Sequence, residues 1–242
     1  MHKPVLGILG GVGPLATAYF MELLIKKTPA RTDQDHMPMI VFNDPQIPDR
    51  TAYILDHAQP NPQDEMAKVA RWLEEAGSDY IAIACNTAHY FYDAINEAVE
   101  VPVVNIMEET AKRIAETAGS GATVGLLATE GTVESGVFQG FFEQWGLQVK
   151  APDAEGQDHI THLIYDCVKA NQPYDEQEFL YEAWRLRKGG CDAVVVGCTE
   201  LSVIYQELEK RPTWMYDSLD ILADRCVDIY LTARRSGGLI EM

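Results

Sequence analysis

The sequence predicts an α/β protein made of two similar halves, each with a mainly parallel β-sheet covered by helices. Short apolar runs alternate along the chain with longer amphipathic segments, which is the pattern of strand–helix–strand units. Glycines stand just past four of the amphipathic segments, where helices commonly end: Gly77, Gly119, Gly146 and Gly189. A sequence pattern of the first half also recurs in the second half as an internal repeat.

Seven apolar runs have the length and composition of buried strands. They are Val5–Leu9, Met39–Asn43, Tyr80–Ala84, Val101–Asn105, Thr123–Ala128, Ala193–Val196 and Thr213–Tyr216. A glycine turn and the start of a helix follow the first of them. Further amphipathic segments predict helices at Asp64–Ala76, Glu108–Thr117, Val133–Trp145, Gln157–Val168 and Glu176–Lys188. The segment Asp44–Thr51 contains two prolines and predicts a loop, which can form a lid that carries Arg50.

The internal repeat places a glycine-rich strand and a later cysteine turn in each half. The run at residues 7–11 is echoed at 124–131, and the run at 81–87 is echoed at 194–200. The spacing from Gly7 to Cys85 is 78 positions, and the spacing from Gly125 to Cys198 is 73. We therefore expect two α/β domains, one of residues 1–105 with 209–242 and one of residues 106–208. The last strand and helix, from about Thr213 onward, are expected to return to the first domain.

The composition is that of a globular protein with a strong negative charge. Hydrophobic residues make up 47% and charged residues 23%, and 37 acidic against 19 basic residues give a formal charge of −18. This charge repels phosphate backbones and anionic lipid, so neither nucleic acid nor a membrane surface is an expected partner. No run approaches the ~18 apolar residues of a membrane span, and glycines interrupt the apolar N-terminal run that superficially resembles a signal peptide.

Five cysteines without a CxxC pair favour a reducing cytoplasm over a disulfide framework. His159 and His162 lack the further ligands of a metal site, so no metal is expected. Cys167, Cys191 and Cys226 are expected to fill the core.

The other two cysteines occupy the position at which open α/β sheets bind ligands. Cys85 and Cys198 each follow a β-branched apolar strand and precede a helix, where backbone N–H groups are free and the helix dipole is positive. Such a position is expected to lower the pKa of a thiol. Two thiols that face each other across a cleft suit racemisation, in which one thiolate removes the α-proton and the opposite thiol delivers a proton to the other face.

Four motifs, in this order and at this spacing, resemble the aspartate/glutamate racemase family. They are GILGGVGPLAT at residues 7–17, NDPQIPDRT at 43–51, ACNTAH at 84–89 and GCTEL at 197–201. LATEG at 127–131 and YDCVKA at 165–170 also fit, so the resemblance covers nearly the whole chain. Within the family, the motifs are most similar to those of the cofactor-independent aspartate racemases.

This resemblance implies two pseudo-symmetric, Rossmann-like domains, an active site in the cleft between them, and a homodimer. It implies interconversion of L- and D-aspartate by proton transfer at Cα between Cys85 and Cys198, with neither pyridoxal phosphate nor a metal. The implied substrate-binding residues are Asn86, Thr87, Thr129 and Thr199 at the α-carboxylate and ammonium end, Glu200 nearby, and Arg50 and Lys169 at the side-chain carboxylate. A racemase of the same family that acts on glutamate or another amino acid is the alternative.

Two interpretations outside this class stay open at the level of sequence. Residues 11–16 satisfy the GxGxxA pattern of dinucleotide-binding proteins, which would make the chain an NAD-dependent oxidoreductase. That pattern lacks an acidic residue at the end of the second strand, because Asp33 and Asp35 precede the strand and Asp44 lies in the loop. A non-enzymic amino-acid-binding protein would explain a two-domain cleft but not the paired thiols. His89, four residues after Cys85, either tunes that thiol or points away from it.

Overall fold

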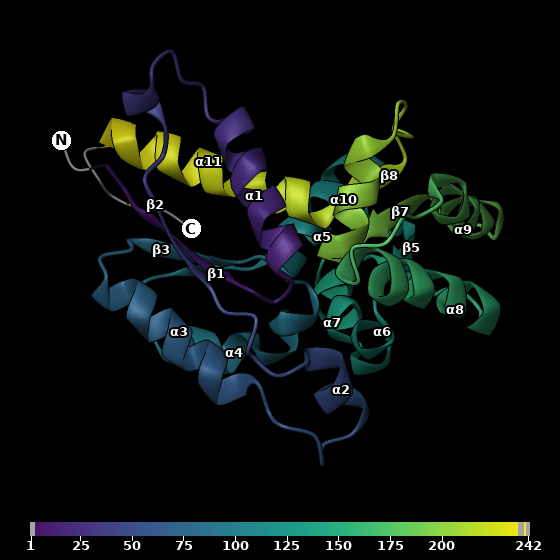
Figure 1. Cartoon of the computed structure of the whole chain (residues 1–242). Coiled ribbons are helices and arrows are strands. Elements are labelled where there is room, and N and C mark those ends of the chain that lie inside the picture. The colour runs from purple at the N-terminus through teal and green to yellow at the C-terminus, as the bar shows by residue number, and fades with distance from the viewer. Residues whose placement is uncertain (1–2, 237–239, 241–242) are drawn as a thin grey trace.

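The computed structural model describes residues 3–236 and 240, and it confirms the predicted α/β class (Figure 1). Two sheets of four parallel strands have the orders β2-β1-β3-β4 and β6-β5-β7-β8. The first sheet consists of β1 (Leu6–Gly10), β2 (Met39–Asn43), β3 (Tyr80–Ile83) and β4 (Val103–Val104). The second consists of β5 (Thr123–Leu127), β6 (Gln148–Lys150), β7 (Ala193–Val196) and β8 (Met215–Asp217). The strand order is therefore the same in both sheets, as the internal repeat predicts.

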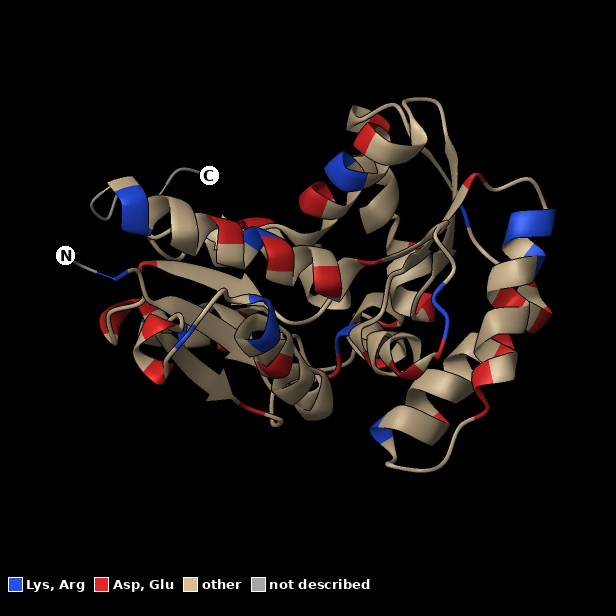
Figure 2. Ribbon diagram, turned by 90° about the horizontal axis from the view of Figure 1, so that it is seen from above, with Lys and Arg blue, Asp and Glu red and all other residues tan. Residues whose placement is uncertain are grey.

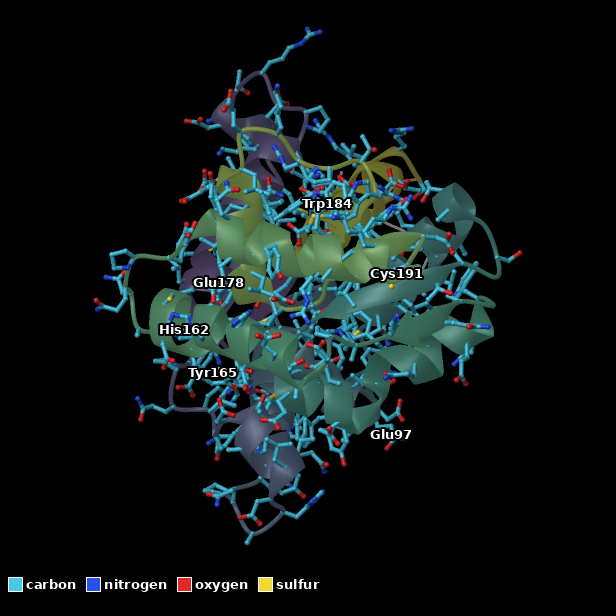
Figure 3. The ribbon with its side chains drawn as sticks, turned by 90° about the vertical axis from the view of Figure 1, so that its right-hand side faces the viewer. Glu97, His162, Tyr165, Glu178, Trp184 and Cys191 are labelled. Atoms are coloured by element: carbon cyan, nitrogen blue, oxygen red, sulfur yellow. The ribbon has the colours of Figure 1, made fainter. Side chains whose placement is uncertain are left out.

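Helices cover both faces of each sheet (Figure 1). The first half contains α1 (Pro14–Lys27), η1 (Asp33–Asp35), α2 (Arg50–Leu55), α3 (Gln63–Glu75), η2 (Thr87–Phe91) and α4 (Tyr92–Asn96). The second half contains α5 (Ile106–Ala118), α6 (Glu130–Ser135), α7 (Val137–Gln144), α8 (Ala154–His162), η3 (Leu163–Lys169), α9 (Glu176–Lys188) and α10 (Thr199–Glu207). The helix α11 (Ser218–Ser236) follows β8. Figure 3 shows the outer layer of the second half, where the segment with His162 and Tyr165 lies beside α9 with Trp184.

One of the three buried apolar clusters spans both halves. Alternate residues of β1 face opposite layers, so that Leu6 packs on the side of α1 and α11 whereas Leu9 packs on the side of α3. Leu126 of β5 belongs to the same buried cluster as Leu6, because α11 packs against both α1 and α5, and α5 packs against α7. Continuous burial of these strands matches their apolar composition, as expected for parallel sheets with two covered faces.

The repeated glycine of β1 and β5 has a packing reason in both halves. A Cβ on Gly7 would lie 2.6 Å from Ser78 Oγ, and a Cβ on Gly125 would lie 2.9 Å from Leu186 Cβ. In each case the segment before the next central strand crosses close to the glycine. The glycine therefore recurs because a neighbouring segment packs closely against the strand in both halves, and not because both halves need the same turn.

One expectation about the chain path is wrong. The last strand does not return to the first domain: β8 pairs in parallel with β7 of the second sheet, with Val194 opposite Met215 and Val196 opposite Asp217. The reason is that β8 completes the second sheet as its fourth strand. The helix that follows does reach the first half, since α11 packs on α1. Residues 1–2, 237–239 and 241–242 of the proposed first domain lie outside the described residues, and the remaining division into domains stays a prediction.

Two predicted helices also differ in detail. The helix expected at 133–145 is divided into α6 and α7, because Gly136 adopts a left-handed conformation with φ of 64°. The helix expected at 157–168 starts as α8 and continues as the π-helix η3. The loop expected at 44–51 ends in the short helix α2, which begins at Arg50. Among the described residues, no helix is long and apolar enough to cross a membrane.

Candidate active site

Both sequence-predicted catalytic cysteines lie just beyond the carboxyl ends of central strands. Cys85 stands two residues after β3 and Cys198 two residues after β7, at equivalent places of the two halves. Each of the nine predicted site residues lines one enclosed cavity between the halves. Its lining consists of Val12, Asp49, Arg50, Thr51, Cys85, Asn86, Thr87, Thr129, Lys169, Cys198, Thr199 and Glu200.

The cavity is nearly closed in this structure. It leaves about 10 Å³ for the centres of water molecules, which is the room needed by a single water. The helix α2 packs against α6 of the other half, and a Cβ on Gly131 would lie 2.8 Å from Thr51 Cα. On the side of Arg50 and Lys169, the cavity adjoins an open pocket of about 330 Å³. The cavity and this pocket share two cationic and two acidic residues, Arg50, Lys169, Asp49 and Glu200.

Arg50 is a buried cation held by backbone carbonyls. Asp49 caps α2 by accepting a hydrogen bond from Ala52 N–H, which places Arg50 in the first turn. The Arg50 guanidinium donates to the carbonyl oxygens of Ile47 and Pro48 at 3.2 and 2.9 Å. Its Nε is buried and has no hydrogen-bond partner within the described part of the chain. This guanidinium thus has donor capacity left for an anionic ligand.

Lys169 and Glu200 form a second charged group at the cavity. The Lys169 ammonium lies 3.9 Å from an oxygen of Glu200 and 3.9 Å from an oxygen of Asp49. It also lies 4.4 Å from the centre of the Tyr165 ring, a cation–π contact. Burial opposes its charge, but Glu200 and the neighbouring anionic groups raise the pKa of Lys169 above its ordinary value. Lys169 is therefore a permanent cation near neutral pH.

Four threonine hydroxyls from both halves form a hydrogen-bonded cluster at the cavity. Thr87 and Thr129 are 3.1 Å apart, and both contact Thr132, at 2.8 and 2.9 Å. Thr51 of α2 donates to Thr129 at 3.2 Å. Thr129 also caps α6, whose first turn packs on α2. The cluster ties the arginine-bearing helix to both cysteine-bearing halves.

The two thiols differ in their surroundings. The Cys198 thiol donates to Glu200 Oε2 at 3.1 Å, and burial together with the Glu200 charge raises the pKa of Cys198 well above its usual value. Burial also raises the pKa of Cys85, but the Arg50 charge and a hydrogen bond from the Ala88 N–H act in the opposite direction. The expectation of lowered thiol pKa values is therefore wrong for this closed form, because desolvation outweighs the helix termini.

His89 acts on the backbone of Cys85 rather than on its thiol. The ring is buried, with Nδ1 2.8 Å from the Cys85 carbonyl oxygen, and Nε2 accepts a hydrogen bond from Ile106 N–H at 3.2 Å. An acceptor role for Nε2 places the proton on Nδ1, which then donates to Cys85. Burial lowers the pKa of His89 to about 4, so the ring is neutral near pH 7. His89 does not line the cavity.

Three lining residues, Val12, Asp49 and Thr51, and one member of the threonine cluster, Thr132, were not predicted from the sequence. The proximity of Asp49 and Thr51 to Arg50 in the motif at 43–51 was the available signal for two of them. Cys167, Cys191 and Cys226 are buried free thiols, as expected. No three His, Cys, Asp or Glu side chains in the described ranges are arranged to hold a metal ion.

The glycine turn after β1 packs against protein instead of cradling a phosphate. Gly11 has φ of +87°, and a Cβ there would lie 2.2 Å from the backbone of Asp44. A Cβ on Gly13 would lie 2.3 Å from Glu200 Oε1. In dinucleotide-binding proteins, the pyrophosphate occupies the space beside these glycines. Here that space holds backbone and a carboxylate, which argues against the dinucleotide alternative.

Comparison with known proteins agrees with this geometry. Residues 9–226 match the family described as Asp/Glu/hydantoin racemase. The broad specificity amino-acid racemase RacX of Bacillus subtilis is 30% identical over 235 residues, which cover 94% of this chain and 98% of the relative. The aspartate racemase of Picrophilus torridus has 29% identity and a TM-score of 0.77, with coverage of 98% of this chain and 96% of that one.

A glutamate racemase from Francisella tularensis, solved in complex with D-glutamate, has the same fold. Its TM-score is 0.66 at 18% identity, over 99% of this chain and 84% of that one. The shared architecture is two α/β halves with parallel sheets. The family match spans most of the chain, and the 30% identical relative covers 94% of it. The chain belongs to the Asp/Glu/hydantoin racemase family.

Proposed function

We propose that this chain is a cofactor-independent racemase that interconverts L- and D-aspartate, with Cys85 and Cys198 as its two acid–base groups. Two thiols at equivalent positions of a repeated fold line one enclosed cavity, and this observation carries the proposal. A reaction that removes and replaces a proton on opposite faces of one carbon needs such a pair. Binding without chemistry needs neither thiol.

The charges around the cavity favour a dicarboxylic amino acid. Arg50 and Lys169 line both the cavity and the open pocket, and two cations there support the binding of a side-chain carboxylate. Thr87, Thr129 and the start of α10 at Thr199 offer hydroxyl and backbone donors for the α-carboxylate. Racemases named for glutamate and for broad specificity also resemble this chain, which makes them the alternatives to test.

The difference between the thiols gives the reaction a starting state. Cys198 is the thiol, since its proton lies between sulfur and the Glu200 carboxylate. Cys85 starts the reaction as the thiolate: burial raises its pKa, but the Arg50 charge and the Ala88 N–H favour its anion over that of Cys198, whose pKa is raised well above its usual value. The Cys85 thiolate takes the α-proton, and Cys198 delivers its proton to the opposite face of Cα. The products are a Cys85 thiol, a Cys198 thiolate and the inverted amino acid, and the reverse reaction starts from this state.

Stabilisation of the carbanion falls to the groups around the α-carboxylate, where negative charge builds up. Backbone N–H groups at the start of α10 and the threonine hydroxyls are fixed before the reaction, so they need no reorganisation. Closure of α2 over the substrate removes water and strengthens these interactions. Glu200 exchanges the Cys198 proton along the existing 3.1 Å contact, which lets Cys198 change roles between the two directions.

The deciding experiment is racemisation in heavy water. The enzyme is incubated with L-aspartate, and deuterium at Cα is followed together with formation of D-aspartate; two-base transfer must place solvent deuterium in the product. Both enantiomers of glutamate and asparagine serve as substrate controls. If aspartate keeps its α-proton on prolonged incubation, the proposed function is refuted.

The two-base scheme has its own test. Cys85→Ser and Cys198→Ser should each abolish most racemisation, because a hydroxyl is a far weaker acid than a thiol. Cys226→Ser is the matched control, since Cys226 is a buried thiol of the core cluster that spans both halves and is not part of the cavity lining. Full activity in both directions with either Cys85→Ser or Cys198→Ser would exclude two-base transfer. A homodimer and a cytoplasmic location, which would keep the free thiols reduced, remain predictions.

A further inference from the structure

A serine outside the cavity lining joins the two cysteine turns. Ser218 is the first residue of α11 and is fully buried. Its Oγ lies 2.8 Å from the carbonyl oxygen of Val196, the last residue of β7 before the Cys198 turn. The same Oγ lies 2.9 Å from Nδ2 of Asn86, the residue after Cys85. One hydroxyl thus contacts the segments that carry both thiols.

The hydrogen-bond donors and acceptors at Ser218 determine how the Asn86 amide is oriented. A serine hydroxyl has one proton to donate, and a backbone carbonyl can only accept. Ser218 donates its proton to Val196, so it can only accept from Asn86. Asn86 therefore directs its NH2 group to Ser218 and its carbonyl oxygen away from it. That oxygen, Oδ1, is buried and has no hydrogen-bond partner among the residues described, and Asn86 lines the cavity.

The position of Ser218 is itself fixed by the preceding residue. The Asp217 carboxylate accepts hydrogen bonds from Ser202 Oγ at 2.6 Å, Gln206 Nε2 at 3.1 Å and Leu219 N–H at 3.0 Å. These donors come from α10 and from the first turn of α11. The start of α11 is thereby clamped to the helix that follows Cys198.

We infer that Ser218 is a positioning residue that keeps the Asn86 carbonyl oxygen directed at the cavity, where it accepts a hydrogen bond from the α-ammonium group of the substrate. This inference rests on the proposed function. A buried acceptor without a partner needs a donor, and the ammonium is the only strong donor on an amino acid. A carboxylate at the same place would be repelled by Oδ1. Ser218 therefore acts through Asn86 and does not itself contact the substrate.

The test separates recognition of the ammonium from recognition of the carboxylates. In Ser218→Ala the Asn86 amide is free to turn, and KM for aspartate should rise about tenfold, as for loss of one hydrogen bond to a charged group. Succinate has both carboxylates but no ammonium, so its inhibition constant should change less than twofold. In an Asn86→Ala background, the added Ser218→Ala change should have almost no further effect on KM.

Ser202→Ala is the matched control, because it removes a buried hydroxyl from the same clamp without touching Asn86. Ser202→Ala should change KM for aspartate and the inhibition constant of succinate by the same factor, or change neither. Two outcomes would refute the positioning role and leave the proposed function standing, provided that the wild-type enzyme racemises aspartate. In the first, Ser218→Ala weakens the binding of aspartate and of succinate alike. In the second, Ser218→Ala raises KM for aspartate as much in the Asn86→Ala background as in the wild type. The positioning role is likewise refuted if Ser202→Ala reproduces the selective loss of aspartate. Failure of the wild-type enzyme to exchange the α-proton would refute the proposed function and this inference together.

Discussion

Gly13→Ala tests whether the position of the Glu200 carboxylate matters for the reaction. Gly13 has φ of −130° and ψ of 134°, a region open to alanine, so the backbone itself is not strained by the change. The new Cβ would lie 2.3 Å from Glu200 Oε1, and real Cβ atoms do not come closer than 3.0 Å to other atoms. Glu200 Oε1 must therefore retreat by at least about 0.7 Å.

The expected damage is to activity rather than to folding. Glu200 borders the cavity and can move into it, so the clash is relieved without disturbing the core. As N-cap of α1, alanine in place of glycine costs at most about 1 kcal/mol, which lowers Tm by roughly 2–4 °C in a protein of this size. The carboxylate, however, leaves its 3.1 Å contact with Cys198 and its 3.9 Å pair with Lys169. Displacements of this order cost about 100-fold in catalysis.

The assay is kcat/KM for racemisation from both enantiomers of aspartate, with thermal unfolding measured on the same samples. Gly140→Ala is the control, because a Cβ on Gly140 of α7 meets no atom within 4 Å. That change should raise stability by up to about 1 kcal/mol through helix propensity and leave kcat/KM unchanged. A Gly13→Ala enzyme with wild-type kcat/KM in both directions would show that Glu200 has no part in handling the Cys198 proton.

Two further predictions follow from other buried groups. Arg50→Ala should raise KM for aspartate about 100-fold or more, since a buried charge partner of a carboxylate contributes about 3 kcal/mol; the inhibition constant of succinate should rise in parallel, and an unchanged KM would remove Arg50 from the site. For His89, the folded-state pKa of about 4 lies below the ordinary 6.5, so the unfolded chain binds the proton first as pH falls. The stability that comes from the neutral, buried His89 is therefore complete above pH 6.5 and is lost as the pH falls toward 4. At pH 5 the free energy of unfolding should be lower by about 2 kcal/mol for this reason. The urea midpoint should therefore fall less between pH 7.5 and pH 5 in His89→Gln than in the wild type. An equal fall in both proteins would contradict a buried, neutral His89.

The sheets were largely predictable because parallel strands with two covered faces are continuous apolar runs. The expected bounds of two strands, 39–43 and 193–196, agree with β2 and β7. The strand β6 was missed since Gln148–Lys150 is a largely exposed, polar edge strand without an apolar run. The placement of β8 could not be derived, because pairing with β7 is a long-range contact that no local pattern encodes.

The sequence motifs predicted which residues line the site, but not the electrostatics of the thiols or the residues that support the site from outside the motifs. The cysteine turns and the segment at 43–51 identify lining residues, and the structure brings all nine together. The predicted direction of the thiol pKa shifts was wrong because burial raises both pKa values. How deeply the thiols are buried depends on packing between the halves, which the local sequence does not show. Ser218 stands 132 residues from Asn86, so its role follows only from their contact in the folded chain.

The formal charge of −18 makes an acidic substrate unexpected, yet the site charges resolve this difficulty. Asp and Glu residues are spread over helices of both halves (Figure 2), and beyond the ~8 Å screening length in physiological salt they contribute little. Within the cavity, Asp49 and Glu200 offset the charges of Arg50 and Lys169. The Lys169 ammonium stands 3.9 Å from each acidic neighbour, well beyond the ~2.8 Å of a charged hydrogen bond. A substrate carboxylate that approaches to hydrogen-bond distance therefore gains an interaction that neither neighbour makes, and the overall negative charge does not oppose it.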